Sequence, residues 1–204
     1  MVLYYQLPLA RLIHAQMEAH FWQKATAYEA RVHQGFDSAS RVHYALPKDE
    51  SVRNFRTAVT ERSEIKNMIF GGFEKCLFAQ QKFDADPERR FAVILEDDAD
   101  VQKWVKPARR VFQIDYARGE AYEPDFVVET TGEKLMCEVK RTDQLSHPDV
   151  LSKARAGILW CKHASDHEMA NAGKPWRYVM IPHDAVVENM TLGGLIARYV
   201  RNEL

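Results

Sequence analysis

The sequence lacks a surplus of charge of either sign. Its 204 residues contain 28 lysines and arginines against 29 aspartates and glutamates, which gives a formal net charge of −1. A protein that binds nucleic acid on its own usually carries a clear basic excess. We therefore expect weak DNA affinity for this chain by itself, with contact to a polyanion limited to local groups of basic side chains.

Cysteines and long apolar stretches are also scarce. The three cysteines, Cys76, Cys137 and Cys161, show no paired spacing of the kind typical of disulfide frameworks or zinc sites. We expect buried thiols, because free cysteine is among the most buried residue types. No apolar run approaches the roughly 20 residues that span a bilayer. The start lacks the basic segment of a secretion signal, so we expect a cytoplasmic protein without a membrane partner.

A nucleotide-binding signature is missing as well. No G-x-x-x-x-G-K-[ST] sequence, which would hold the phosphates of ATP, occurs in the chain. Internal repeats and low-complexity tracts are not found either. The length and the 46% hydrophobic content are typical of one substantial globular domain.

The most informative feature that is present joins two acidic residues and a lysine. Tyr122-Glu123-Pro124-Asp125 leads into an apolar, β-prone run, and a second such run ends in Glu138-Val139-Lys140. Gly132 and the threonines between the runs predict a hairpin turn. Antiparallel pairing would bring Asp125 near Glu138, and the two-residue period of a strand would place Glu138 and Lys140 on one face.

These residue types suit one kind of chemistry. Carboxylate oxygens are the ligands that Mg²⁺ prefers, and a nearby lysine can orient a water for attack on a phosphodiester. The alternative is a surface hairpin whose Glu138 and Lys140 form a solvated pair. The pattern alone leaves both interpretations open.

The surrounding periodicity predicts an α/β fold. Helical spacing covers residues 88–99 and 149–166, and strand patterns cover residues 111–117 and 176–181. With the two motif strands, the order is helix, strand, strand, strand, helix, strand. Upstream, helical patterns cover residues 8–33, 51–60 and 64–70, and Gly71-Gly72 interrupts the last of these.

This order resembles the core of the PD-(D/E)xK nuclease superfamily, with an acid on the first helix, Pro-Asp on the second strand and Glu-x-Lys on the third. A narrower similarity, to the endonuclease domain of type III restriction enzyme Res subunits, covers about residues 50–200. The segments that carry it are Ile65 to Lys75, Lys82 to Asp84, Pro87 to Phe91, Val101 to Pro107, Tyr122 to Thr130, Trp160-Cys161, Lys174 to Trp176 and Ile181 to Asp184.

The resemblance implies a mixed sheet flanked by helices and a Mg²⁺-dependent endonuclease that cuts double-stranded DNA, with Mn²⁺ able to replace Mg²⁺. It implies that Asp125, Glu138 and Glu88 hold the metal and that Lys140 completes the catalytic set. Glu88 could instead serve only the helix dipole, since it lies near a helix N-terminus.

The resemblance also implies partners. Residues 1–80 would be a helical appendage and linker to a helicase motor that this chain lacks, and residues 81–204 the nuclease domain. ATP would act only through that motor, and a methyltransferase (Mod) subunit would recognise the DNA sequence. The alternatives are a repair or junction-resolving nuclease of the same superfamily, and a non-catalytic DNA-binding or docking module.

Local charge supplies the remaining expectations. The acidic residues Glu96, Asp97, Asp98 and Asp100 are interpreted as a solvated helix end. A basic rim for the DNA backbone is expected from Lys103, Lys106, Arg109, Arg110, Arg141 and Lys153. The alternative for these six residues is scattered charge that serves solubility.

Overall fold

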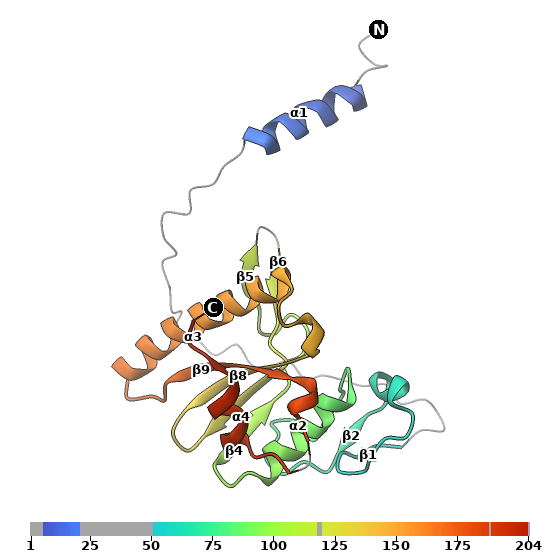
Figure 1. Ribbon diagram of the computed structural model, residues 1–204, viewed down its shortest axis with the longest axis vertical. Helices are drawn as coiled ribbons and strands as arrows, with labels where there is room; N and C mark the ends of the chain where they lie inside the picture. Colours follow the sequence, from blue (N-terminus) through green and yellow to red (C-terminus); the bar gives the residue numbers. More distant parts are fainter. Residues whose placement is uncertain (1–5, 21–50, 118–119, 188, 204) are drawn as a thin grey trace. The chain divides into compact units, whose positions relative to one another are not determined.

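The structure is a computed structural model that describes residues 6–20, 51–117, 120–187 and 189–203 (Figure 1). The chain divides into two compact units, Met1–Phe36 and Asp37–Leu204. In the first unit, α1 spans Gln6–His20 and overlaps the first part of the helix expected over residues 8–33. The remainder of that expected helix lies outside the described residues. No described helix has the length and apolar character needed to cross a bilayer.

A five-stranded mixed sheet forms the centre of the second unit. Its strand order is β10-β9-β8-β7-β4. The β4, β7 and β8 strands pair antiparallel, β9 lies parallel to β8, and β10 pairs antiparallel with β9. The expected α/β class is confirmed. The strand bounds are Val101–Val105 for β4, Phe126–Thr130 for β7, Lys134–Lys140 for β8, Trp176–Pro182 for β9 and Val200–Arg201 for β10.

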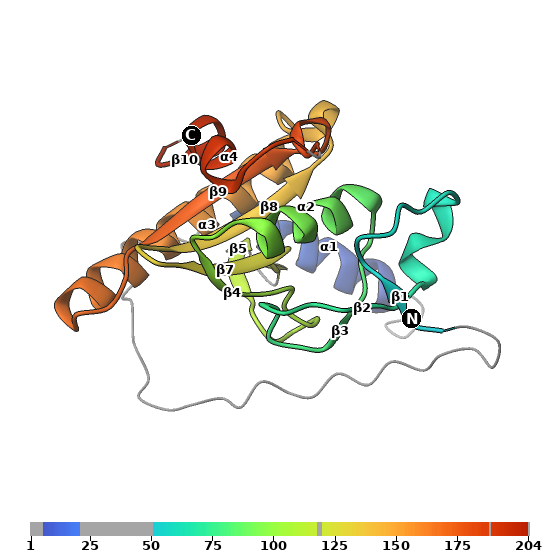
Figure 2. The same cartoon turned by 90° about the horizontal axis from the view of Figure 1, so that it is seen from below.

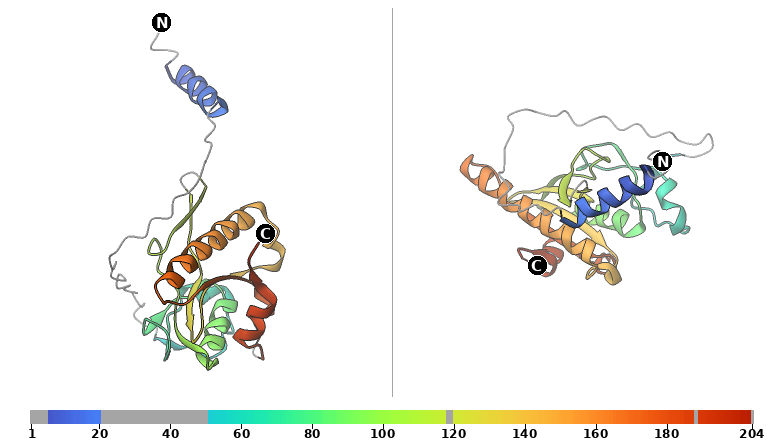
Figure 3. Two further views of the ribbon diagram at one scale, coloured as in Figure 1. Left: turned by 90° about the vertical axis from the view of Figure 1, so that its left-hand side faces the viewer. Right: turned by 90° about the horizontal axis from the view of Figure 1, so that it is seen from above.

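Helices cover both faces of this sheet (Figure 2 and Figure 3). The α2 helix (Asp86–Asp97) and the α4 helix (Leu192–Tyr199) share one apolar core with Leu135 and Cys137 of β8. The α3 helix (Pro148–Ala170) packs on the other face, where Met136 belongs to a second core. Successive side chains of β8 thus point to opposite faces of the sheet and enter two different apolar cores, as expected for a strand.

Local signals placed most of these elements correctly. The helices expected over residues 88–99 and 149–166 are present as α2 and α3, and each has a proline in its first turn. The strand expected over residues 176–181 is β9. The three cysteines are free thiols; Cys137 and Cys161 are buried as expected, whereas Cys76 is only partly buried.

One expected core strand was wrong. Part of the segment 111–117 forms β5 (Ile114–Ala117), which pairs only with β6 (Glu120–Tyr122) in a separate two-stranded sheet. The core position belongs to β4, whose pairing with β7 is interrupted by a bulge between Val101 and Lys103. The bulge breaks the two-residue alternation, so the sequence pattern of this strand is hidden.

The helix expected over residues 51–60 was also wrong, and of the one expected over residues 64–70 only a 3₁₀ turn over its first part is present. The segment folds instead into a small sheet of order β1-β2-β3 with a 3₁₀ helix, η2, between its first two strands. Buried Phe55, Ile65 and Phe70 hold it by apolar contact, which outweighs the helical preference of the local sequence. The bounds are Arg53–Asn54 for β1, Arg62–Asn67 for η2, Phe70–Gly71 for β2 and Gln80–Gln81 for β3.

This segment belongs to the same hydrophobic core as α2 and β7. The Phe83 and Phe126 rings stack with centroids 6.5 Å apart, and Phe73 meets Trp104 edge-on at 5.2 Å. The sequence predicted a boundary at residue 80. In the described residues, side chains from both sides of that boundary, such as Phe70 and Phe91, belong to one core.

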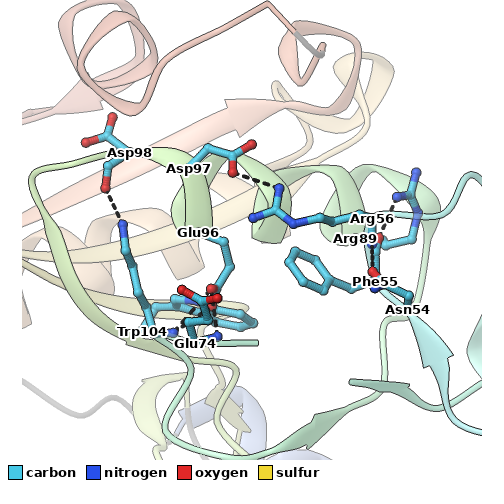
Figure 4. A network of polar contacts seen from close by, with 10 residues as sticks. Asn54, Phe55, Arg56, Glu74, Arg89, Glu96, Asp97, Asp98 and Trp104 are labelled. Carbon is cyan, nitrogen blue, oxygen red and sulfur yellow. Dashed lines mark hydrogen bonds and ion pairs between the residues drawn. The ribbon is translucent and has the colours of Figure 1, made fainter. Parts of the chain in front are cut away.

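A buried carboxylate ties the segment to α2 and β4 (Figure 4). Glu96 is only 7% exposed. It accepts hydrogen bonds from the backbone N–H groups of Glu74, Lys75 and Cys76 at 2.8–3.2 Å, and from Trp104 Nε1 at 2.7 Å. The expectation that Glu96 is solvated was therefore wrong, because four donors compensate its burial.

We expect Glu96→Ala to lower the free energy of unfolding by about 3 kcal/mol, since it leaves several buried donors without an acceptor. The control is Asp97→Ala, which removes one ion pair with Arg56 between side chains that are about half exposed. That change should have an effect of about 0.5 kcal/mol or less. Urea unfolding of both variants measures the difference, and equal values would contradict the role of Glu96.

Candidate active site

The pairing of β7 with β8 brings the two motif acids together. Phe126 faces Cys137 in the antiparallel register, so the preceding Asp125 lies across from Glu138. The Asp125 carboxylate accepts a 2.9 Å hydrogen bond from the backbone N–H of Val139. The expected hairpin is confirmed, and this hydrogen bond fixes Asp125 beside the end of β8.

Glu138 is almost fully buried, with 3% of its surface exposed. One carboxylate oxygen lies 2.5 Å from Lys140 Nζ, and the other accepts a 2.8 Å hydrogen bond from the Tyr122 hydroxyl. Burial raises the pKa of Glu138 to about 7, and the charge of Asp125 adds to this rise, while Lys140 opposes it. Burial also raises the pKa of Tyr122 well above its usual value, so Tyr122 stays a hydrogen-bond donor.

Glu88 approaches from the first turn of α2. Its carboxylate accepts a 2.9 Å hydrogen bond from the backbone N–H of Asp84, and it lies 3.0 Å from Lys106 Nζ. Burial raises the pKa of Glu88 to about 7; Lys106 lowers the pKa and Asp125 raises it. Glu88 therefore lies in the first turn of α2, as the helix-dipole alternative expected, and also close to the charge of Asp125. Its role as a metal ligand stays a prediction.

Lys106 lies at the centre of the acidic residues and is only 14% exposed. Its Nζ atom is 3.0 Å from Glu88, 3.1 Å from Asp84 and 4.0 Å from Asp125. Burial lowers the pKa of Lys106, but these carboxylates outweigh burial and the net pKa is raised. Lys106, which we expected in a basic rim for DNA, is held within the acidic cluster next to the β4–β7 pairing. Its contact with DNA stays a prediction.

The cluster has an excess of negative charge. Four carboxylates (Asp84, Glu88, Asp125 and Glu138) meet two ammonium groups (Lys106 and Lys140), a formal charge of −2. Its donors are oxygen atoms, which suit Mg²⁺. Within the described ranges, however, no three His, Cys, Asp or Glu side chains are grouped closely enough to hold a metal ion. The ammonium groups stand between the carboxylates instead.

A cleft of about 720 Å³ adjoins the cluster. Asp84, Lys106 and Asp125 line it, so it leads directly to the acidic side chains. Its other basic residues are Lys66, Lys82 and Arg109. Of these three, only Arg109 was expected in the basic rim for DNA. Lys66 comes from η2, which had been assigned to the appendage.

The remaining expected DNA-binding residues do not gather at this cleft. Lys103 pairs in register with Glu129 on β7. Arg141 forms an ion pair with Asp143 at 2.8 Å, and Lys153 forms one with Asp149 at 2.6 Å. The Arg110 backbone donates to Glu123. Of the six residues expected in the basic rim, Lys106 and Arg109 are the two that line this cleft. DNA binding by these six residues stays a prediction.

Sequence reasoning missed three contributors to the cluster. Lys106 and Tyr122 reach it through pairing of segments far apart in the sequence, which no local pattern reveals. Asp84 was within reach of such reasoning, because it lies four residues before Glu88 and just ahead of the helix start signal.

The raised pKa values of Glu88 and Glu138 predict a pH dependence of stability. Without divalent metal, the folded protein binds more protons than the unfolded chain between pH 4.5 and 7, so the free energy of unfolding falls as pH rises through this window. Glu138→Gln should flatten this fall and stabilise the protein at pH 8 by on the order of 2 kcal/mol.

Thermal unfolding in the presence of a chelator, at intervals between pH 4.5 and 8, measures this effect. Glu129→Gln on the same hairpin is the control, because Lys174 lowers the pKa of Glu129 and its titration lies below the window. If Glu138→Gln and Glu129→Gln show the same pH profile, the buried carboxylate does not cause the dependence.

Comparison of the chain with models of protein families, with curated proteins and with solved structures gave no match. The similarity to type III endonuclease domains therefore stays a prediction from sequence motifs. Function is inferred below from the chemistry of the acidic cluster and its cleft.

Proposed function

We propose that this chain is a Mg²⁺-dependent endonuclease domain that hydrolyses phosphodiester bonds of double-stranded DNA as the cutting module of a type III restriction enzyme. One observation carries the proposal. Asp125 faces Glu138 beside Lys140, and Glu88 joins them from α2 through Lys106. Acids and lysines that converge beside a cleft are the residue types that metal-assisted phosphodiester hydrolysis uses. A metal ion would have to displace the lysines that stand between the acids.

The fold supports the proposal through its connectivity. The order α2, β4, β7, β8, α3, β9, with β9 parallel to β8 and the preceding strands antiparallel, is consistent with a PD-(D/E)xK core. In this interpretation β4 takes the place that the sequence analysis gave to residues 111–117. The two acids then come from the second and third core strands, and Glu88 from the first core helix.

The proposed roles follow from the positions of the side chains. Asp125, Glu138 and Glu88 would hold the Mg²⁺ ion, which when bound supplies positive charge to the attacking and leaving oxygens. Tyr122 holds Glu138 in place through its hydroxyl. Burial lowers the pKa of Lys140, but Glu138 and Asp125 outweigh this and raise it. Lys140 is therefore protonated, and we assign it the role of a donor to the phosphate oxygens rather than a base.

The cleft would receive the DNA backbone. Lys66, Lys82 and Arg109 bring positive charge from two segments that flank Asp125. Three such contacts give a low affinity that salt removes readily. Because the chain alone would bind DNA weakly, the proposal includes two partners. A methyltransferase (Mod) subunit would recognise the DNA sequence, and an ATP-driven helicase motor would deliver the DNA. Autonomous cleavage should then be slow and nonspecific.

One observation favours a second candidate, a non-catalytic DNA-binding or docking module with the same fold. The ammonium groups of Lys106 and Lys140 already neutralise part of the acidic cluster. A repair or junction-resolving nuclease would use the same residues as the main proposal. Metal binding and cleavage by variants of the cluster separate the catalytic from the non-catalytic candidate.

The first test concerns the metal. Asp125→Asn keeps an acceptor for the Val139 N–H but removes the negative charge, so we expect Mn²⁺ affinity to fall at least about tenfold. Isothermal titration calorimetry measures the affinity. Asp143→Asn is the control, because Asp143 is exposed and forms an ion pair with Arg141. Equal affinity of wild type and Asp125→Asn would reject the metal assignment.

The second test concerns catalysis. Lys140→Met should reduce cleavage of long duplex DNA, at low salt with Mg²⁺, by about 100-fold or more, since a donor to the developing charge is lost. Mn²⁺ binding should persist. Lys162→Met, at an exposed position on α3, is the control and should cut at the wild-type rate. A Lys140→Met protein with undiminished cleavage would show that Lys140 is not catalytic.

A further inference from the structure

Lys106 holds an unusual position among the basic residues of the chain. It directly follows β4, and its Nζ atom lies 5.8 Å from the ring centroid of Phe126. Its carboxylate partners come from three places: Asp84 before α2, Glu88 in α2 and Asp125 before β7. Lys140, by contrast, pairs with Glu138 of its own strand. Lys106 is thus the cation that joins separate elements of the cluster.

The position of Lys106 conflicts with metal binding by its partners. Its ammonium group lies between Glu88 and Asp125, two of the three carboxylates that would hold a divalent cation. The Glu88 oxygen nearest to Lys106 also accepts the Asp84 N–H. A metal ion held by Glu88 and Asp125 would therefore compete with Lys106 for these two carboxylates.

The same position explains why a lysine is useful there. Glu88 is buried and lies near the charge of Asp125. Buried carboxylates without a counterion are strongly unfavourable. A tethered ammonium group compensates them without any ion from solution, so the cluster can form before a metal binds.

The cleft offers space for the Lys106 side chain when it leaves the carboxylates. This side chain lines the cleft of about 720 Å³, together with Lys66 and Arg109. Its flexible four-carbon stem allows the ammonium group to turn toward the cleft while the backbone stays in place. There it would add a positive charge to the residues that face the substrate backbone.

We propose that Lys106 is a tethered counterion that a divalent cation displaces. Without the ion it bridges Glu88 and Asp125; with the ion bound, it turns into the cleft and contacts a phosphate of the DNA. This inference rests on the proposed nuclease function and adds a coupling to it. Metal binding frees a cation for the substrate, so metal and DNA each strengthen binding of the other.

The first experiment compares Mn²⁺ affinity by calorimetry in wild type and Lys106→Met, with Lys103→Met on β4 as the control. Removal of the competing ammonium should raise Mn²⁺ affinity about fivefold or more, while Lys103→Met stays at the wild-type value. In Lys106→Met, Mn²⁺ should also increase duplex DNA affinity less than it does in wild type.

The outcomes separate this inference from the proposed function. If wild type binds Mn²⁺ and Lys106→Met binds it equally or more weakly, the counterion role is overturned and the nuclease proposal stands. If neither protein binds Mn²⁺, both proposals fall.

A second measurement uses the wild-type chain and does not depend on the folding of a variant. Acetylation of lysine amines, followed by mass spectrometry, reports how accessible each ammonium group is. Lys106 should be protected in the presence of a chelator and react at least about fivefold faster at saturating Mn²⁺, whereas exposed Lys103 should not change. Unchanged protection of Lys106 with Mn²⁺ bound would overturn the proposal.

Discussion

The site depends on one register, that of β7 against β8. With Phe126 opposite Cys137, the Asp125 carboxylate meets the Val139 N–H, and Glu138 lies on the face of β8 that carries Met136. A slip of one residue would turn Glu138 toward the apolar core that holds Leu135. The apolar residues on both faces of β8 therefore fix the chemistry at its end, because any other pairing would bury charge without a partner.

A second constraint sets the wall of the cleft. The Glu96 carboxylate gathers three consecutive backbone N–H groups and the Trp104 indole, which fastens the segment before α2 to the central sheet. That segment carries Lys66 to the cleft. A group that seemed to belong to the solvated surface thus positions one side of the substrate path.

Sequence reasoning succeeded for contacts between residues close together in the sequence and failed for contacts between distant segments. Asp125, Glu138 and Lys140 lie within one hairpin, so apolar runs and a turn were sufficient to bring them together. Lys106 depends on the packing of β4 against α2, which no local pattern encodes. The bulge in β4 and the two-residue strands before α2 erased the periodicity on which strand prediction relies.

The parallel partner of β8, the β9 strand, is synthesised after the residues of the acidic cluster. Every residue of the acidic cluster precedes Arg141, yet β8 is the middle strand of its sheet and pairs along its length with β9, from Lys134 opposite Trp176 to Lys140 opposite Pro182. The 23-residue α3 helix must emerge before this pairing can begin. Long-range parallel pairing is slow because the chain must close a large loop first. On the ribosome, all residues of the acidic cluster are therefore synthesised before β9 is available to hold β8 in place.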